Sequence, residues 1–166
     1  MVKYYNAMVV FEEIPDEITL AINITNCPCH CPGCHSQFLW EDIGTELTFN
    51  ELDRLIKDND GITCVCFMGG DANPREINDL AMRAAMTNVV NNTNLKIAWY
   101  SGKDELSKEI DIELFDYIKI GRYDEKFGPL NVETTNQKLY EVDAMAELID
   151  ITNKFWRKGL HKQDSD

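Results

Sequence analysis

The sequence predicts an α/β fold built around a mostly parallel sheet. Short apolar segments rich in β-branched residues alternate with amphipathic helical patterns along the chain. Each apolar segment ends in glycine, cysteine or small polar residues. Strands that alternate with helices form right-handed βαβ units, and the carboxyl ends of their strands meet at one edge of the sheet. We therefore expect a ligand site at that edge.

Four segments are predicted as strands, and each leads into a loop of unusual composition. The strands cover residues 18–25, 62–68, 95–100 and 116–120. The second is a continuous apolar run, which is typical of a strand buried on both faces. The loops that follow carry, in order, the cysteine-rich segment 27–34, Gly69-Gly70-Asp71, Ser101-Gly102 and Gly121.

Three segments are predicted as helices. Thr48 and Glu51 match a capping box, and the apolar positions that follow have helical spacing up to the stop at residues 59–61. Pro74 suits the first turn of a second helix, which runs to about Asn91. Residues 143–156 are predicted to form a third helix.

The length of 166 residues predicts a single domain over residues 1–156, followed by a polar tail over residues 157–166. The chain is too short for a complete eightfold barrel, which needs about 250 residues. Its apolar runs are shorter than the roughly 18 residues that span a membrane. The N-terminus lacks the pattern of a secretory signal, so we expect a cytoplasmic protein with reduced thiols.

The charge balance is strongly acidic. Sixteen Lys and Arg residues face 29 Asp and Glu residues, which gives a formal net charge of −13 at pH 7. This balance argues against non-specific binding to nucleic acid phosphates. A protein partner or a small molecule fits the composition better.

Four of the six cysteines lie within residues 27–34, a density that indicates metal binding. One interpretation is a structural zinc site, in which Cys31 and Cys34 combine with Cys64 and Cys66. However, Cys64 and Cys66 lie in the middle of a predicted strand, where small buried thiols are common.

The other interpretation takes Cys27, Cys31 and Cys34 as a Cys-x3-Cys-x2-Cys run. An ordinary electron-transfer cluster of four irons is closed by four thiolates. Three thiolates leave one iron open to bind another molecule, so this spacing favours a reactive iron–sulfur site.

The Cys27-x3-Cys31-x2-Cys34 run resembles the signature of the radical S-adenosylmethionine (SAM) enzymes. Further segments resemble, in order, the small activating proteins of anaerobic ribonucleoside-triphosphate reductase, and the resemblance extends from about residue 8 to residue 142. Those segments are residues 33–36 with nearby Trp40, 67–71, 99–102, 116–121 and 134–137.

The resemblance implies a partial (β/α) barrel of the radical SAM type, with flanking helices. It implies a 4Fe-4S cluster on Cys27, Cys31 and Cys34 that binds S-adenosylmethionine at its open iron and cleaves it reductively. The resulting 5′-deoxyadenosyl radical would take hydrogen from a glycine of the large reductase subunit. An electron donor such as flavodoxin or ferredoxin is implied, with no nucleic acid or membrane partner.

The resemblance also implies site residues around S-adenosylmethionine. Gly69, Gly70 and Asp71 correspond to the loop that contacts the methionyl amino group, and Trp99 and Ser101 are expected to line the same pocket. His35 is a candidate for contact with adenine, whereas Lys119 and Gly121 are weaker candidates and Cys29 has no assigned role.

Two alternatives remain open at this point. The protein could activate another glycyl-radical enzyme or modify another peptide by radical SAM chemistry. From a different class, it could be a zinc-stabilised binding protein that uses Cys31, Cys34, Cys64 and Cys66.

Overall fold

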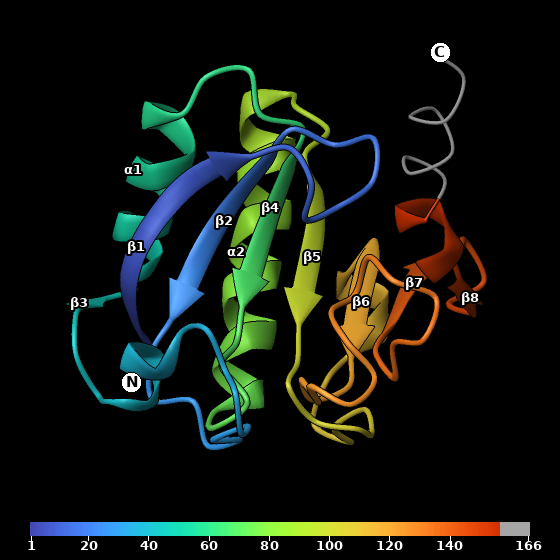
Figure 1. Ribbon diagram of the computed structural model, residues 1–166. Coiled ribbons are helices and arrows are strands. Elements are labelled where there is room, and N and C mark those ends of the chain that lie inside the picture. Colours follow the sequence, from blue (N-terminus) through green and yellow to red (C-terminus); the bar gives the residue numbers. More distant parts are fainter. Residues whose placement is uncertain (157–166) are drawn as a thin grey trace, which may run out of the picture.

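The computed structural model describes residues 1–156, which form one eight-stranded sheet with the strand order β3-β1-β2-β4-β5-β6-β7-β8 (Figure 1). The strands are β1 Lys3–Val10, β2 Thr19–Ile24, β3 Thr45–Glu46, β4 Cys64–Met68, β5 Lys96–Tyr100, β6 Tyr117–Ile120, β7 Lys138–Val142 and β8 Leu148–Asp150. The helices are α1 Phe49–Asp58 and α2 Pro74–Asn91, with short 3-10 turns η1 Gln37–Trp40, η2 Ile112–Leu114 and η3 Thr152–Phe155.

The centre of the sheet is parallel and its two sides are antiparallel. β2, β4, β5 and β6 pair in parallel, so their carboxyl ends lie at one edge, the lower edge in Figure 1. β1 pairs antiparallel with both β2 and β3, and β7 pairs antiparallel with both β6 and β8. The parallel centre therefore gathers the predicted loops at one edge.

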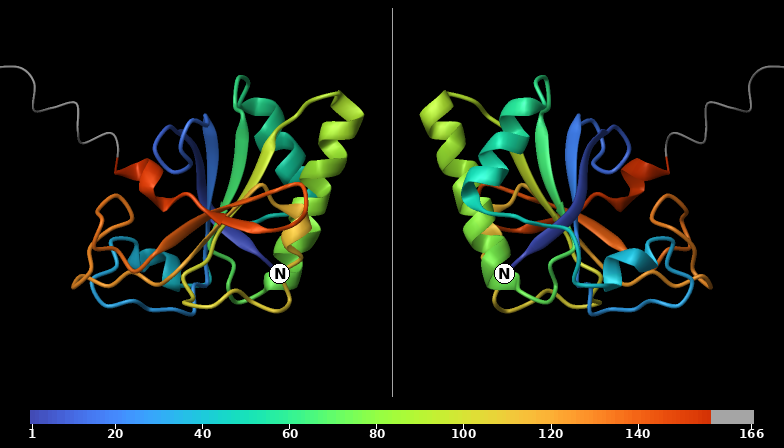
Figure 2. Two further views of the ribbon diagram at one scale, coloured as in Figure 1. Left: turned by 90° about the vertical axis from the view of Figure 1, so that its right-hand side faces the viewer. Right: turned by 90° about the vertical axis from the view of Figure 1, so that its left-hand side faces the viewer.

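The expected partial (β/α) barrel with a mostly parallel sheet and flanking helices is wrong. Four of the seven strand pairings in residues 1–156 are antiparallel. The sheet is open, with β3 and β8 at its two edges. The described chain contains two α-helices, α1 and α2, and both lie on the same side of the sheet (Figure 2).

Most of the predicted strands and helices are confirmed, and one predicted helix is wrong. The four predicted strands correspond to β2, β4, β5 and β6, and the first two predicted helices correspond to α1 and α2. The helix predicted over residues 143–156 is wrong, because this segment forms a turn, β8 and η3. The polar tail predicted over residues 157–166 lies outside the described residues.

The helices begin where their capping signals predict. The Thr48 hydroxyl accepts a hydrogen bond from the Glu51 backbone N–H at 3.1 Å, and Pro74 is the first residue of α2. In the described part of the chain, neither helix has the length and apolar character needed to cross a membrane.

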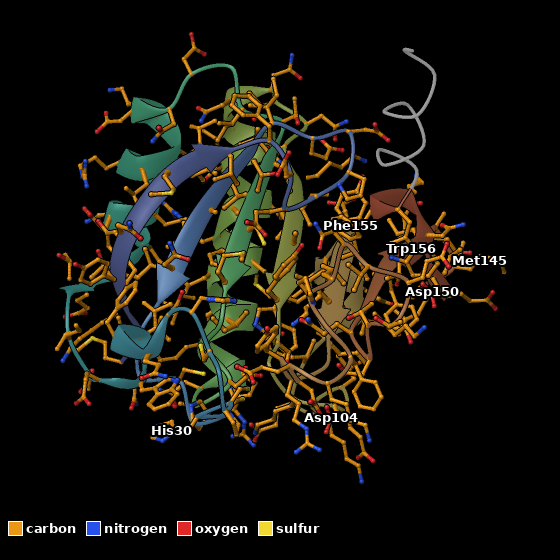
Figure 3. All side chains as sticks on the ribbon, in the orientation of Figure 1. His30, Asp104, Met145, Asp150, Phe155 and Trp156 are labelled. Carbon is orange, nitrogen blue, oxygen red and sulfur yellow. The ribbon has the colours of Figure 1, made fainter. Side chains whose placement is uncertain are left out.

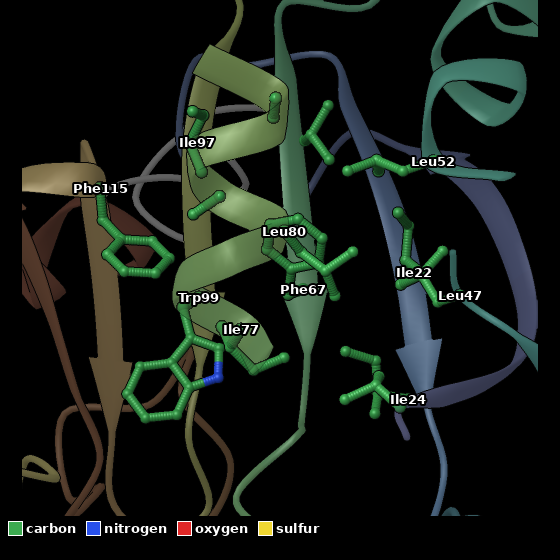
Figure 4. Packing of buried hydrophobic residues seen from close by; sticks show 14 of the residues in the cluster. Ile22, Ile24, Leu47, Leu52, Phe67, Ile77, Leu80, Ile97, Trp99 and Phe115 are labelled. Atoms are coloured by element: carbon green, nitrogen blue, oxygen red, sulfur yellow. The ribbon is translucent and has the colours of Figure 1, made fainter. Parts of the chain in front are cut away.

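The larger hydrophobic core lies between the sheet and the two helices (Figure 4). Alternate residues of the strands point into it, as the two-residue period of a strand requires. β4 contributes Val65 and Phe67, β5 contributes Ile97 and Trp99, and α2 contributes Ile77 among others. This core fixes α1 and α2 on one face of the sheet.

A second, smaller core lies on the opposite face. Cys64 and Cys66 of β4 and Tyr100 of β5 point to this side, where the loop residue Ile14 packs over them. The Tyr100 hydroxyl donates a hydrogen bond to the Glu13 carbonyl, which ties the β1–β2 loop to the sheet. This face is therefore covered by loops and η3 rather than by α1 and α2 (Figure 2).

Phe67→Ala is expected to lower the free energy of unfolding by about 3–5 kcal/mol, because Phe67 is fully buried and its removal leaves a cavity. Phe11→Ala is the matched control, since Phe11 is 64% exposed and its replacement should change stability by less than about 0.5 kcal/mol. Urea unfolding of both variants measures the difference. Equal destabilisation by the two substitutions would contradict the core assignment.

Candidate functional site

A cysteine-rich loop leaves the carboxyl end of β2 and lies at the lower edge of the sheet. Backbone hydrogen bonds close the two ends of the loop: Asn26 N–H donates to the Glu41 carbonyl at 3.0 Å, and Cys27 N–H donates to the Leu39 carbonyl at 2.9 Å. His30 on this loop and Asp104 after β5 both lie at the lower edge (Figure 3). The predicted loops are thus gathered at one edge.

The three predicted iron ligands share this loop as free thiols. Cys31 is buried, and Cys27 and Cys34 are half-buried. The neighbouring Cys29 side chain lowers the pKa of Cys27 to about 6, and the proximity of the two thiols raises the pKa of Cys29. This lowered pKa favours the thiolate form of Cys27, the form that binds metals.

The glycine loop, residues 69–71, follows β4, and its two glycines pack against Ile24 of β2 and Ile77 of α2. Gly69 and Gly70 have φ values of 107° and 92°. The Gly69 carbonyl accepts a hydrogen bond from Trp99 Nε1 at 2.8 Å. Trp99 itself is fully buried in the larger core and does not line a pocket. Its role in this structure is to hold the Gly69 carbonyl through this hydrogen bond.

Asp71 and Ser101 lie together at the ends of β4 and β5. Asp71 is only 4% exposed, and its carboxylate accepts hydrogen bonds from Ser101 Oγ at 2.5 Å and Gly102 N–H at 2.8 Å. Cys29 Sγ lies 3.9 Å from Asp71 Oδ2 and donates to it. Both carboxylate oxygens of Asp71 are thus engaged within the protein.

Lys119 provides a buried positive charge beside this network. Its Nζ donates hydrogen bonds to the carbonyls of Ser101 at 3.2 Å and Gly121 at 2.8 Å. Burial lowers the pKa of Lys119 to about 8, against the opposing effect of nearby Asp71. A lysine within an otherwise apolar strand was the sequence signal for this charge.

The loop between β6 and β7 contacts the cysteine loop from the other side. A Cβ on Gly33 would lie 2.1 Å from the Glu125 carboxylate, so Glu125 packs directly on this glycine, whose φ is 76°. The His35 ring lies 5.6 Å from the Tyr123 ring. Glu125 and Tyr123 were not among the predicted site residues, because no local motif marks contacts between separate loops.

The cysteines of the zinc interpretation are not brought together. Cys64 and Cys66 lie inside β4, and both belong to the smaller core. Within residues 1–156, no three side chains of His, Cys, Asp or Glu are arranged to hold a metal ion. Cys27, Cys31 and Cys34 nevertheless supply thiols, the ligands that iron–sulfur clusters take, from one loop, so the donor chemistry fits a cluster there.

Gly70→Ala is expected to destabilise the protein by about 1–3 kcal/mol, because the residue has a positive φ and its new methyl group would collide with Ile77 at 2.4 Å. Gly61→Ala is the matched control, since Gly61 has a φ of 83° but open space around it. Thermal unfolding of both variants separates backbone strain from the collision. Equal effects would show that Ile77 does not restrict this loop.

A model of the 4Fe-4S single cluster domain family matches residues 18–143, which is more than half of the chain. No curated protein and no solved structure shows significant similarity to it. The matched region includes the cysteine loop, the glycine loop and the buried Asp71 network.

Proposed function

Because the chain belongs to the 4Fe-4S single cluster domain family, an iron–sulfur domain found in radical SAM-type proteins, we propose that it is a radical SAM activase. In this proposal it generates a glycyl radical on the large subunit of anaerobic ribonucleoside-triphosphate reductase. The observation that carries the proposal is that the loop with Cys27, Cys31 and Cys34 and the loop with Gly69, Gly70 and Asp71 follow neighbouring parallel strands, where Cys29 contacts Asp71.

The cysteine loop would hold the cluster, and Cys27, Cys31 and Cys34 would be its ligands. When bound, a cluster with one open iron supplies a single electron for reductive cleavage of the S-adenosylmethionine sulfonium. Cys27 and Cys34 are half-buried rather than enclosed, which leaves the outer side of the loop within reach of an electron donor such as flavodoxin or ferredoxin.

The neighbouring loops would position S-adenosylmethionine. Gly69 and Gly70 would present their backbone to the ligand at this edge, in positive-φ conformations that glycine adopts without strain. Ser101 and Asp71 fix the adjacent corner through their 2.5 Å hydrogen bond. His35, which follows the last cysteine and contacts Tyr123, would flank the adenine.

A protein substrate would need access to the site at the carboxyl ends of the parallel strands. On the face opposite the helices, Asn23 of β2 and Met68 of β4 are partly exposed at the ends of their strands. Asn23 Nδ2 also donates a hydrogen bond to Asn6 Oδ1 at 2.7 Å, which holds this amide pair at the surface. In the proposal, a loop of a partner protein that carries the target glycine would approach past the carboxyl ends of these two strands.

The experiment is anaerobic reconstitution with iron and sulfide, reduction with dithionite, and assay of 5′-deoxyadenosine formed from S-adenosylmethionine. Each assay is run with and without the reductase large subunit. We expect deoxyadenosine, together with a glycyl doublet on the reductase in electron paramagnetic resonance (EPR) spectra.

The other outcomes separate the alternatives. Deoxyadenosine without the doublet would keep the radical chemistry and point to another glycyl-radical enzyme or peptide. A protein that retains iron but never cleaves S-adenosylmethionine would refute the activase proposal. A colourless protein containing zinc would refute the cluster itself.

A further inference from the structure

We propose that Cys29 is a positioning residue that anchors the cysteine loop on the corner formed by Asp71 and Gly102. It is not itself a cluster ligand. This inference rests on the proposed function, because it concerns how the ligands Cys27 and Cys31, two residues to either side, are held in place.

The Cys29 side chain points into the edge of the sheet. Its Sγ lies 3.9 Å from Asp71 Oδ2. A Cβ built on Gly102 would lie only 2.9 Å from the same sulfur, so Cys29 packs directly against the glycine backbone. A larger residue at position 102 would displace the Cys29 sulfur from its contact with Gly102 and Asp71.

The corner that receives the sulfur is rigid. Asp71 is buried and accepts hydrogen bonds from Ser101 Oγ and Gly102 N–H. Lys119 in turn donates to the Ser101 carbonyl, which links the corner to β6. A buried carboxylate is costly unless it is hydrogen-bonded, so a further donor from the loop is favourable.

The anchor acts between Cys27 and Cys31, beside a residue with an unusual backbone conformation. The bonds made by Asn26 and Cys27 hold the two ends. His30, directly after Cys29, has a φ of 45°, a conformation that costs about 1 kcal/mol or more in a non-glycine residue and persists only when its surroundings fix it. Its ring stacks on Trp40 at 4.6 Å with a 12° interplanar angle.

The contacts of Cys29 with Asp71 and of His30 with Trp40 therefore hold two consecutive residues of the loop. The Cys29 sulfur is held on the sheet edge, and the His30 ring is held on η1. With residues 29 and 30 held in place, Cys27 and Cys31 keep a constant spacing before any cluster is bound.

The first test uses the metal-free protein, so it does not depend on the cluster chemistry. Hydrogen exchange of the amides of residues 26–31 is followed by mass spectrometry under reducing conditions. In Cys29→Ala this exchange should be about tenfold faster than in the wild type, as expected for a lost hydrogen bond to a charged group. Cys29→Ser should restore most of the protection, because its hydroxyl can donate to Asp71.

A double-mutant cycle tests the contact with Gly102. Gly102→Ala alone should speed exchange in the loop, because its methyl group displaces the Cys29 sulfur. In the Cys29→Ala background the same substitution should have little further effect, since the sulfur is gone. Additive effects of the two substitutions would overturn the proposed contact.

A comparison with Cys34→Ala separates anchoring from ligation. Cys34→Ala should lose iron while the metal-free loop keeps near wild-type exchange, and Cys29→Ala should show the opposite. In reconstituted protein, Cys29→Ala should keep its iron but broaden the EPR signal of the reduced cluster.

Two results would overturn the anchor: wild-type exchange in Cys29→Ala, or loss of iron from it as complete as in Cys34→Ala. If the wild type itself binds no iron, the proposed function fails. The exchange data on metal-free protein would still decide the role of Cys29.

Discussion

Replacing Cys31 with alanine is expected to abolish cluster binding and to reduce cleavage of S-adenosylmethionine by roughly 100-fold or more. A cluster with an open iron already has the minimum of three protein thiolates, so the loss of one leaves too few to hold it. Cys27→Ala and Cys34→Ala should behave alike. Iron and sulfide content, the absorption near 400 nm and deoxyadenosine formation measure these losses.

Cys66→Ala is the matched control for this prediction. Cys66 is fully buried in β4 and belongs to the smaller core, so its loss removes a cysteine without touching the loop. Burial raises the pKa of Cys66 well above the usual range, which keeps it a neutral thiol. We expect Cys66→Ala to retain its iron after reconstitution. If iron persists in Cys31→Ala and is lost from Cys66→Ala, the ligand assignment is refuted.

The parts of the fold that were predicted correctly depend on local signals. Thr48 and Pro74 mark helix starts, and the apolar run that becomes β4 needs only burial on both faces to form a strand. Because these strands alternate with helices, their carboxyl ends are expected at the same edge of the sheet. The shared edge of the candidate site was therefore predictable.

The antiparallel strands at the sides of the sheet, such as β7 and β8, could not be predicted from local signals. The segment after Asp143 is rich in Ala, Met, Glu and Leu, which favour helix when isolated. In the structure, the Asp143 carboxylate accepts hydrogen bonds from Met145 and Glu147 N–H, and Ala146 has a φ of 59°. This turn pairs β8 with β7, so pairing between strands overrides helix propensity and the predicted barrel becomes an open mixed sheet.

The details of the site depend on contacts between loops far apart in the sequence. Trp99 was expected in the ligand pocket, yet the alternation of β5 directs it into the larger core. The position of the Cys29 side chain depends on its contact with Gly102, more than 70 residues away in the chain. A spacing rule can identify candidate ligands, but it carries no information about such contacts.

The stability of the metal-free protein is expected to depend on pH through Lys119. The pKa of this buried lysine is about 8, below the ordinary value of 10.5. Between these two pH values the unfolded chain therefore binds more protons than the folded protein. The free energy of unfolding therefore rises with pH in this range. The lowered pKa of Lys119 corresponds to a gain of about 3 kcal/mol as the pH increases from about 8 to 10.5.

Other groups titrate in the same range, so the prediction concerns a difference between variants. Burial raises the pKa of Cys64 above its usual range, which makes the folded protein lose stability as the unfolded thiol ionises. This opposing effect is common to the wild type and to Lys119→Met and therefore cancels. Relative to Lys119→Met, the wild type should gain up to about 3 kcal/mol between pH 7 and 10.5.

Urea unfolding at several pH values, with reductant and chelator present, measures this difference. Lys103→Met is the control, because Lys103 is exposed and its removal should leave the pH dependence of the wild type unchanged. If Lys119→Met follows the wild type in parallel across the whole range, Lys119 keeps its proton in the folded protein. The buried charge beside Asp71 would then be fully compensated by its surroundings even without a cluster.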